Sequence, residues 1–371
     1  MNTKIAIGVV ALMLISSVVL TASDNPQKGS IHEGSGDLEM RVHAQASIDK
    51  LMNWYNPSTG LWNTTGWWNS ANSLEATINY ARLTNSHQYD AIIENTYNQA
   101  RSQSVPNGVP FSSNYYDDQL WWCLALIAAY DYLKDTKFLD AAVALFNDSG
   151  YAVDTVCGGG LWWDRQHTQK SSAENLLYII AAGRLYQRTR IHPYYGIAVQ
   201  TWAWFQTSGL LDTGRLLVYD QVQATCGNMG MTTWTYNQGL AVGALYELAQ
   251  LVPSHSLGYT VMERGVLQAS LARLAPNGIL TEPCEATGTC GADGPQFKGV
   301  FMRYVAQVAP HLGQDGLIRP FVQQQVTSLW GSAKRGDNTF GLHWAGPFDS
   351  ADAARQTSAL DAFNAALLLG L

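Results

Sequence analysis

LALIAAYDYL (residues 124–133) and LLYIIAAGRL (residues 176–185) carry apolar side chains on nearly every side of a helix. A helix that is apolar all round is buried on two faces, whereas a surface helix has one apolar stripe. An inner ring of helices enclosed by an outer ring needs helices of the first kind. The two stretches therefore predict an all-α (α/α)6 barrel, a toroid of six helical hairpins. A two-layer helical solenoid is the competing architecture, but no repeat of fixed period is visible in the sequence.

Apolar residues at three-and-four spacing extend this pattern over the rest of the chain and predict further helices. Convincing strand alternation is scarce, and no Pro-rich linker or low-complexity tract divides the chain after its first residues. One catalytic domain over residues 37–371 is therefore expected. The predicted helices cover residues 37–55, 71–85, 88–104, 116–134, 136–148, 172–189, 192–208, 234–251, 257–274, 295–312, 316–334 and 352–370.

The N-terminal stretch has the pattern of a secretory signal. Lys4 supplies a positive start, IAIGVVALMLISSVVL (residues 5–20) an apolar core, and TAS (residues 21–23) a small-residue cleavage site. A membrane anchor is the alternative, although the apolar run is rather short for a span. We therefore predict a signal peptide over residues 1–23, a flexible segment over residues 24–36, and a secreted protein of the extracellular space or cell wall without a stable anchor after cleavage.

The composition narrows the class of partner. The net charge is -7, with 22 Lys and Arg against 29 Asp and Glu, and no basic patch emerges, so nucleic acid is not an expected ligand. The 13 Trp, 18 Tyr and 10 Phe are more than core packing alone requires. Such an excess is frequent where flat sugar or base faces are stacked upon. We expect a monomer with a polysaccharide or oligosaccharide partner.

The five cysteines suit an oxidising compartment. Cys284 and Cys290 lie close enough to close a small loop, and Cys157 with Cys226 would tie two longer loops together. Cys123 would then be a buried free thiol on a helix. This pairing is a hypothesis, because four cysteines already allow three connectivities. The cysteine spacings do not fit a zinc site and the eight histidines show no ligand spacing, so no metal is predicted. Two sequons predict glycosylation at Asn63 and Asn147.

The stretch NYYDDQLWWC (residues 114–123) puts two adjacent aspartates among aromatic rings. The ordinary explanation is a helix start, with one Asp as N-cap and its neighbour in the first turn. Three features favour a catalytic pair. The rings disfavour double ionisation, the preceding loop is rich in Gly, Pro and Ser, and adjacent carboxylates can lie about 5 Å apart, as a retaining glycosidase requires. Asp117 and Asp118 are therefore the catalytic candidates, one as nucleophile and the other as proton donor.

The long connections between the predicted helices are rich in Trp, Asp, Asn and Gln, which suit a site for a neutral polyol. For Trp121 and Trp122, packing into a helix layer is an equal alternative to sugar stacking. Each polar candidate also has a structural explanation. Asp164 could cap its own loop, and Asn237 and Gln238 could hydrogen-bond to backbone groups at a helix start. For the cations Lys298 and Arg303, a surface salt bridge is as plausible as a place in the cleft. The candidate stacking residues are Trp62, Trp67, Trp68, Trp121, Trp122, Trp162 and Trp163, and the candidate polar contacts are Asp164, Asp220, Tyr236, Asn237, Gln238, Lys298 and Arg303.

Several stretches, in order along the chain, resemble glycoside hydrolase family 76, the endo-α-1,6-mannanases and related fungal cell-wall proteins. They are YYDDQLWWC (residues 115–123), VCGGGLWWDRQ (156–166), SSAENLLY (171–178), TYNQG (235–239), QFKG (296–299) and HWAGPF (343–348). The resemblance implies an (α/α)6 fold and retaining cleavage or transfer at α-1,6-linked mannose. In that family's pattern Asp117 is the nucleophile and Asp118 the general acid/base. The resemblance also adds Asn175, although SSAENLLY departs slightly from the expected form, and it favours sugar contact for residues 236–238.

The predicted function is thus retaining, endo-acting hydrolysis of α-1,6-mannosidic linkages in mannan, without a cofactor. A cell-wall mannan transglycosylase that uses the same covalent intermediate is one alternative. A catalytically inactive glycan-binding protein is another, and the cost of crowding two carboxylates counts against it. Glu282 and Glu285 would be reserve carboxylates if the aspartate pair were structural, and His343 is expected to be a packed loop residue.

Overall fold

The computed structural model describes residues 35–313 and 315–371. The predicted signal peptide and nearly all of the predicted flexible segment lie outside the described residues, and only residues 35 and 36 of that segment are seen, as the start of the first helix. Among the residues that the structure describes, no helix combines the length and the apolar character needed to cross a membrane.

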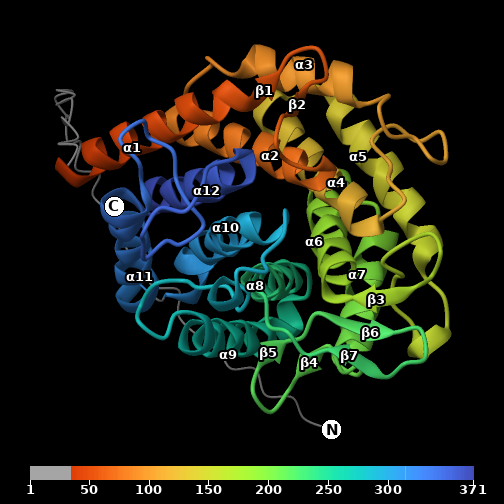
Figure 1. The fold of residues 1–371 in the computed structure, drawn as a ribbon. Coiled ribbons are helices and arrows are strands. Elements are labelled where there is room, and N and C mark those ends of the chain that lie inside the picture. Colours follow the sequence, from red (N-terminus) through yellow and green to blue (C-terminus); the bar gives the residue numbers. More distant parts are fainter. Residues whose placement is uncertain (1–34, 314) are drawn as a thin grey trace, which may run out of the picture.

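Six helices form a closed inner ring. Each contacts the next in chain order, and the last contacts the first, so the ring closes. Figure 1 shows this toroidal arrangement. The inner helices are α2 (Trp67–Thr84), α4 (Tyr116–Leu133), α6 (Ser172–Thr189), α8 (Thr235–Leu251), α10 (Gly294–Leu312) and α12 (Ala353–Leu369).

Six further helices cover the ring from outside. Five of them pack chiefly on an inner helix next to them in the chain, whereas the first packs chiefly on α12 and so joins the two ends of the chain. These outer helices are α1 (Ser35–Leu51), α3 (Asp90–Ala100), α5 (Thr136–Ser149), α7 (Pro193–Phe205), α9 (Ser256–Leu274) and α11 (Asp315–Ser328). The prediction of an (α/α)6 barrel is confirmed.

The inner helices are buried on most sides, as the apolar stretches predict. In α4 the residues from Gln119 to Ile127 are all buried, and in α6 those from Ser172 to Gly183 are. Small residues allow close packing between neighbours. A side chain at Gly299 on α10 would place its Cβ 2.5 Å from the Cα of Ser358 on α12, so glycine is required there. Burial of this kind supplies most of the stabilising free energy of an all-α domain.

The predicted helix bounds differ from the observed ones at two informative places. Helix α2 begins at Trp67, four residues before the predicted start, so that Trp67 and Trp68 lie in its first turn. The stretch predicted as one helix over residues 316–334 is α11 followed by a short π-helix, Leu329–Ala333. The first difference matters for function, because it places Trp68 in the first turn of an inner helix.

Short strands occur only in the connections, within the described residues. A three-stranded antiparallel sheet has the order β3-β6-β7, formed by β3 (Gln169–Ser171), β6 (Gln221–Gln223) and β7 (Asn228–Gly230). Two small hairpins pair β1 (Tyr55–Asn56) with β2 (Leu61–Trp62) and β4 (Leu211–Asp212) with β5 (Leu217–Val218). In Figure 1 the strands β3 to β7 gather on one side of the ring, beside α6 to α8.

Two disulfides fasten these connections, and both predicted pairs are confirmed. Cys157 is bonded to Cys226, and Cys284 to Cys290. Cys123 is a buried free thiol on α4, as expected, and lies 3.3 Å from the carbonyl oxygen of Ala142. Glycosylation stays a prediction: Asn63 lies in an exposed turn and Asn147 is exposed on α5.

Candidate active site

A pocket of about 280 Å³ lies where the inner helices begin. Helices α2, α4, α6, α8 and α10 all contribute a residue from their first turn or from the position just before it. Their N-terminal ends carry partial positive charge, which favours carboxylates and electron-rich ligands at this end of the ring. The lining residues are Trp68, Asp117, Trp121, Trp163, Gln169, Ser171, Asp220, Gln221, Tyr236, Asp293 and Phe297.

The start of α4 is held in place by the loop that carries Trp163. The backbone N–H of Tyr116 donates to the Trp163 carbonyl at 2.7 Å, and the N–H of Arg165 donates to the Asn114 carbonyl at 3.0 Å. The Arg165 guanidinium donates to the Ser113 carbonyl at 2.8 Å. These bonds fix the first turn of α4, and with it both aspartates, relative to the pocket wall.

Asp117 is a half-buried pocket residue. Burial raises the pKa of Asp117 to about 7, and a hydrogen bond from the Trp163 side chain opposes that rise. Its Oδ1 has no hydrogen-bond partner among the described residues. The structure thus holds a carboxyl group that ionises near neutral pH and whose Oδ1 is buried without a hydrogen-bond partner among the described residues.

Asp118, the next residue, is also half-buried. Burial raises the pKa of Asp118 well above its usual range, and the charge of Asp117 raises it further. The Ser113 hydroxyl donates to Asp118 Oδ2 at 3.1 Å. Of the two groups, Asp118 therefore keeps its proton more firmly, and Asp117 is the one that ionises first. Such a pair can supply one nucleophile and one proton donor.

Two acidic residues near the pair were missed by the sequence analysis. Glu174 is buried beside the pocket, accepts hydrogen bonds from the Ser171 N–H and hydroxyl, and has its pKa raised by burial and by the charge of Asp117. Asp293 lines the pocket and accepts a hydrogen bond from Trp68 Nε1 at 2.7 Å. The available signals were a Ser-x-x-Glu capping box at the start of α6 and an Asp before Gly-Pro at the start of α10.

Five of the candidate sugar contacts line the pocket: Trp68, Trp121, Trp163, Asp220 and Tyr236. The Tyr236 ring stacks on Phe297 with ring centroids 4.1 Å apart. Asp220 accepts a hydrogen bond from Asn237 Nδ2 at 3.1 Å, and burial raises its pKa. The pocket therefore combines flat aromatic faces with carboxyl groups, which suits a ligand with both hydroxyl groups and apolar ring faces.

The structure places four other predicted contacts behind the pocket wall. Asp164 accepts from the Thr168 N–H at 2.9 Å and so closes its own loop. Asn175 bonds through Oδ1 to the Leu161 N–H at 2.8 Å, and Gln238 bonds to the N–H and carbonyl of Val218 at 2.9 and 2.7 Å. Asn237 is buried and orients Asp220, as described above. These amides and this carboxylate position the loops that form the wall.

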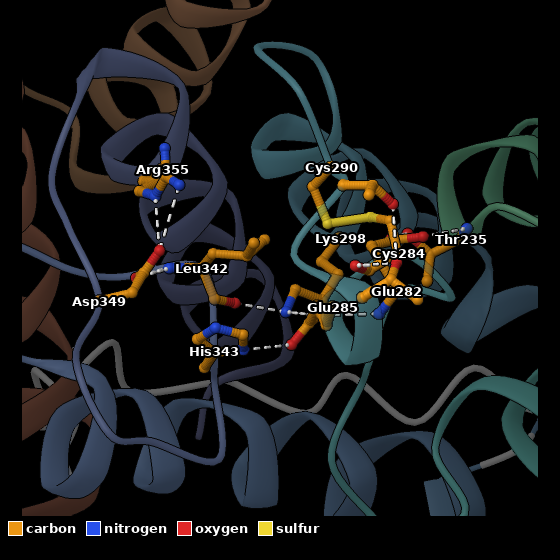
Figure 2. The surroundings of a disulfide bond; sticks show 12 residues. Thr235, Glu282, Cys284, Glu285, Cys290, Lys298, Leu342, His343, Asp349 and Arg355 are labelled. Atoms are coloured by element: carbon orange, nitrogen blue, oxygen red, sulfur yellow. Dashed lines mark hydrogen bonds and ion pairs between the residues drawn. A yellow bond between two sulfur atoms is a disulfide. The ribbon is translucent and has the colours of Figure 1, made fainter.

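Lys298 does not line the pocket either, and its ion pair is not on the surface. Its side chain is 0% exposed, and its Nζ donates to Glu285 Oε1 at 2.6 Å and to the Leu342 carbonyl at 2.5 Å (Figure 2). The expectation of a cation in the cleft or a surface salt bridge therefore needs correction: desolvation lowers the pKa of Lys298, and the Glu285 carboxylate opposes that change. Arg303 is likewise buried, in an ion pair with Asp361.

The reserve carboxylates have structural partners. Glu282 accepts hydrogen bonds from the N–H and hydroxyl of Thr235 at the start of α8, and Glu285 pairs with Lys298 and with His343 Nδ1, the latter at 3.0 Å (Figure 2). His343 is accordingly a loop residue held by an acid, as expected. Neither glutamate lines the pocket.

The tryptophans divide between the pocket and the core. Trp121 lines the pocket, whereas Trp122 is fully buried against Trp67 and Trp62 is buried elsewhere. Trp162 donates to Asp154 Oδ2 at 2.7 Å behind the loop. Within residues 35–313 and 315–371, no three or more His, Cys, Asp or Glu side chains are grouped so that they could hold a metal ion.

The sequence model of glycosyl hydrolase family 76 matches residues 39–370. The chain belongs to this family. A Schizosaccharomyces pombe protein, provisionally named a mannan endo-1,6-alpha-mannosidase, is 28% identical in an alignment that covers 86% of this chain and 77% of its own length. The Candida albicans mannan endo-1,6-alpha-mannosidase DCW1 is 29% identical in an alignment that covers 62% of this chain and 55% of its own length.

Solved structures of family 76 proteins share the fold. An inactive variant of the alpha-1,6-mannanase GH76A from Salegentibacter sp. HEL1_6, in complex with alpha-1,6-mannotriose, aligns with a TM-score of 0.79 at 22% identity over 89% of this chain and 99% of that one. Dfg5 from Chaetomium thermophilum, in complex with glucosamine, aligns with a TM-score of 0.79 at 21% identity over 90% and 91%. At these identities the likeness establishes the (α/α)6 fold that the family shares.

Proposed function

We propose that this family 76 protein is a retaining endo-α-1,6-mannosidase that acts on mannan outside the cell or in the cell wall. The observation that carries the proposal is the pair Asp117–Asp118 in the first turn of α4, where Asp117 lines an aromatic pocket and Asp118 follows it, with both pKa values raised and Asp118 the more firmly protonated. A protein that only binds glycans gains nothing from the free-energy cost of this pair.

The chemistry follows from the adjacency of the two groups. In the first step an ionised Asp117 oxygen attacks the anomeric carbon, and Asp118 gives its proton to the glycosidic oxygen, so that the leaving sugar departs with a new hydroxyl group. In the second step Asp118, now ionised, takes a proton from water, and the water oxygen displaces Asp117 from the anomeric carbon. Two inversions at one carbon give net retention.

The order of the two pKa values assigns the roles. The general acid must carry a proton when substrate binds, and the charge of Asp117 helps Asp118 to keep it. The nucleophile must be ionised, and the Trp163 hydrogen bond and the start of α4 both favour the charged form of Asp117. Asp117 lines the pocket and Asp118 does not, which also supports Asp117 as the attacking group.

The substrate class is supported by relatives. Several of them are named mannan endo-1,6-alpha-mannosidases, and an inactive variant of a structural neighbour, with two adjacent aspartates replaced, is seen with alpha-1,6-mannotriose. The adjacency of Asp117 and Asp118 here has the same form. Extracellular or cell-wall location is proposed from the predicted signal peptide and the nature of the substrate.

Product analysis tests the proposal. The protein and its Asp117→Asn and Asp118→Asn variants are incubated with linear α-1,6-mannan oligomers, and the products are separated by length. We expect shorter oligomers from the unaltered protein and neither variant to cleave at more than a trace of that rate. Longer products would show transfer to a sugar acceptor in place of hydrolysis, and full activity in both variants would refute the site.

A further inference from the structure

Besides Asp117, the carboxyl groups of Asp220 and Asp293 line the pocket, and the proposed chemistry uses neither. Asp293 lies directly before α10, yet its side chain makes no capping hydrogen bond to that helix. It accepts instead from Trp68 Nε1, across 225 positions of the chain. Both residues line the pocket together with Asp117. Because Asp293 stands where it could cap α10 but accepts a hydrogen bond from a pocket tryptophan instead, we infer that its side chain serves the pocket.

We propose that Asp293 is a positioning residue of the glycosidase site, which holds the Trp68 indole as a stacking wall for a sugar ring and places a negative charge in the pocket that Asp117 lines. The inference rests on the proposed function and assigns it a residue beyond the aspartate pair. It has two parts, one geometric and one electrostatic, and each part can fail alone.

The geometric part concerns the orientation of Trp68. An indole has a single hydrogen-bond donor, Nε1–H, and Asp293 uses it at 2.7 Å. The ring is tilted against Trp121 on α4 and Phe297 on α10, with centroids 5.7 and 6.1 Å apart. Rotation of Trp68 would break the hydrogen bond and both ring contacts. The ring therefore presents an apolar face, and no free donor, to a ligand in the pocket.

Asp293 itself is held by a rigid loop. The N–H of Gly294 donates to the carbonyl of Cys290 at 3.1 Å, and the disulfide Cys284–Cys290 closes the loop (Figure 2). A side chain at position 294 would bring its Cβ to 2.8 Å from the Cβ of Cys290, so glycine is needed for this approach. The buried Lys298–Glu285 pair fastens the same loop to α10. Asp293 is thus placed before any ligand arrives.

The electrostatic part concerns the catalytic pair. After burial, the negative charge of Asp293 is among the causes that raise the pKa of both Asp117 and Asp118. Loss of that charge lowers both pKa values. The nucleophile then ionises at lower pH, and the acid also loses its proton at lower pH. The whole pH–rate profile, both its acid limb and its alkaline limb, moves to lower pH.

Two substitutions at one position separate the parts. Asp293→Asn keeps an oxygen that can accept from Trp68 but removes the charge: we expect KM within about twofold of the unaltered protein and a pH–rate profile displaced downward by roughly half a pH unit. Asp293→Ala removes both: we expect the same displacement and a KM raised about three- to tenfold. Trp68→Phe should raise KM without moving the profile.

The control is Asp140→Asn, which removes one negative charge from an exposed position on α5 outside the pocket. It should change neither KM nor the profile. Equal KM values for the Asn and Ala variants would refute the hold on Trp68. A profile that stays in place in both Asp293 variants would refute the electrostatic part.

A measurement without substrate keeps the inference distinct from the proposed function. Carbon-13 NMR titration of the aspartate carboxyl groups follows the Asp117–Asp118 pair directly, and in Asp293→Asn the pair should titrate at lower pH than in the unaltered protein. If the unaltered protein neither cleaves nor transfers α-1,6-mannan, the proposed function falls while this titration still decides the effect of Asp293. If the Asp117–Asp118 pair titrates at the same pH in Asp293→Asn as in the unaltered protein, the electrostatic part of the inference is refuted.

Discussion

Carboxyl groups in two parts of the inner ring differ in whether an arginine pairs with them. From the middle of the inner helices towards their C-terminal ends, Arg303 pairs with Glu75 at 2.6 Å and Asp361 at 2.7 Å, and Arg184 lies 3.5 Å from Glu75. At the N-terminal end, the pKa values of Asp117 and Asp118 are raised by burial, and no arginine is among the groups that oppose the rise. We infer that the carboxylates paired with arginine stabilise the barrel, whereas those without an arginine partner are free to take part in chemistry.

A cavity of about 610 Å³ at the C-terminal half makes the contrast sharper. It is larger than the active-site pocket, and its lining includes Arg184, Arg188, Arg303 and several acids. Those acids and arginines are paired with one another, as in Arg188 with Asp131 and Arg184 with Glu247. Size alone therefore does not mark the site; the presence of uncompensated carboxyl groups beside aromatic faces does.

The largest expected effect comes from removing the proposed nucleophile. Asp117→Asn should lower kcat by about 10⁴-fold, because the substituted amide cannot form the covalent intermediate. Circular dichroism should show an intact fold, since the Asp117 carboxyl makes few contacts that stabilise it. Residual activity within tenfold of the unaltered protein would place the chemistry elsewhere, and Asp140→Asn, an exposed change of equal charge, serves as the reference.

The second effect should appear at the opposite end and in stability. Arg303→Met leaves Asp361 buried without its cation and Glu75 with only the more distant Arg184, which costs about 3–5 kcal/mol of unfolding free energy. Denaturant titration measures the loss. The matched control is Arg335→Ala, which removes an exposed partner of Asp337 and should cost within about 0.5 kcal/mol. Similar costs for both variants would remove the distinction between the two kinds of ion pair.

The third effect tests the cost of the catalytic pair itself. Because both folded-state pKa values lie above the unfolded ones, the folded protein binds more protons between about pH 4 and pH 7, and its stability falls as pH rises through that window. The double variant Asp117→Asn, Asp118→Asn lacks this contribution. It should be more stable than the unaltered protein at pH 8 by about 2 kcal/mol and indistinguishable from it near pH 4. A variant that is less stable at pH 8 would show the pair to be structural.

The smallest effect concerns a carboxylate of neither kind. Glu263 on α9 is fully buried, its two oxygens have no hydrogen-bond partner among the described residues, and burial raises its pKa to about 8. Glu263→Gln should stabilise the protein by about 1 kcal/mol above pH 8, change little near pH 5, and leave kcat and KM unaltered. Thermal unfolding at both pH values measures this, and an accompanying loss of activity would give the outer ring a catalytic role.

Most of the fold follows from the sequence because helix periodicity is a local property. Apolar residues at three-and-four spacing locate the long helices α1 to α12, although the stretch predicted over residues 316–334 runs beyond the end of α11 at Ser328, and the short 3-10 and π helices were not predicted. The start of α2 was not predicted, because its first turn is aromatic and follows Gly66, a residue typical of loops. In the structure Asn69 caps the helix there by accepting a hydrogen bond from the Gly66 N–H.

The site follows from the sequence only where the chemistry is local. Two adjacent carboxylates among rings stand out without any tertiary information, so Asp117 and Asp118 could be selected. The partners of other polar residues lie 14 to 44 positions away: Asn175 bonds to Leu161, Gln238 to Val218, and Lys298 to Leu342. Nothing in a local pattern tells whether such a side chain turns to a loop or to the pocket. Asp293 was overlooked for the same reason, since its partner Trp68 is on α2.

The stereochemistry of the first product tests the central claim most directly. Adjacent carboxylates that act as nucleophile and acid require retention, so proton NMR recorded during the first minutes of α-1,6-mannotetraose cleavage should show the α-anomer of the new reducing end before mutarotation. Initial appearance of the β-anomer would mean a single displacement by water and would contradict the assignment of Asp117 as the attacking group.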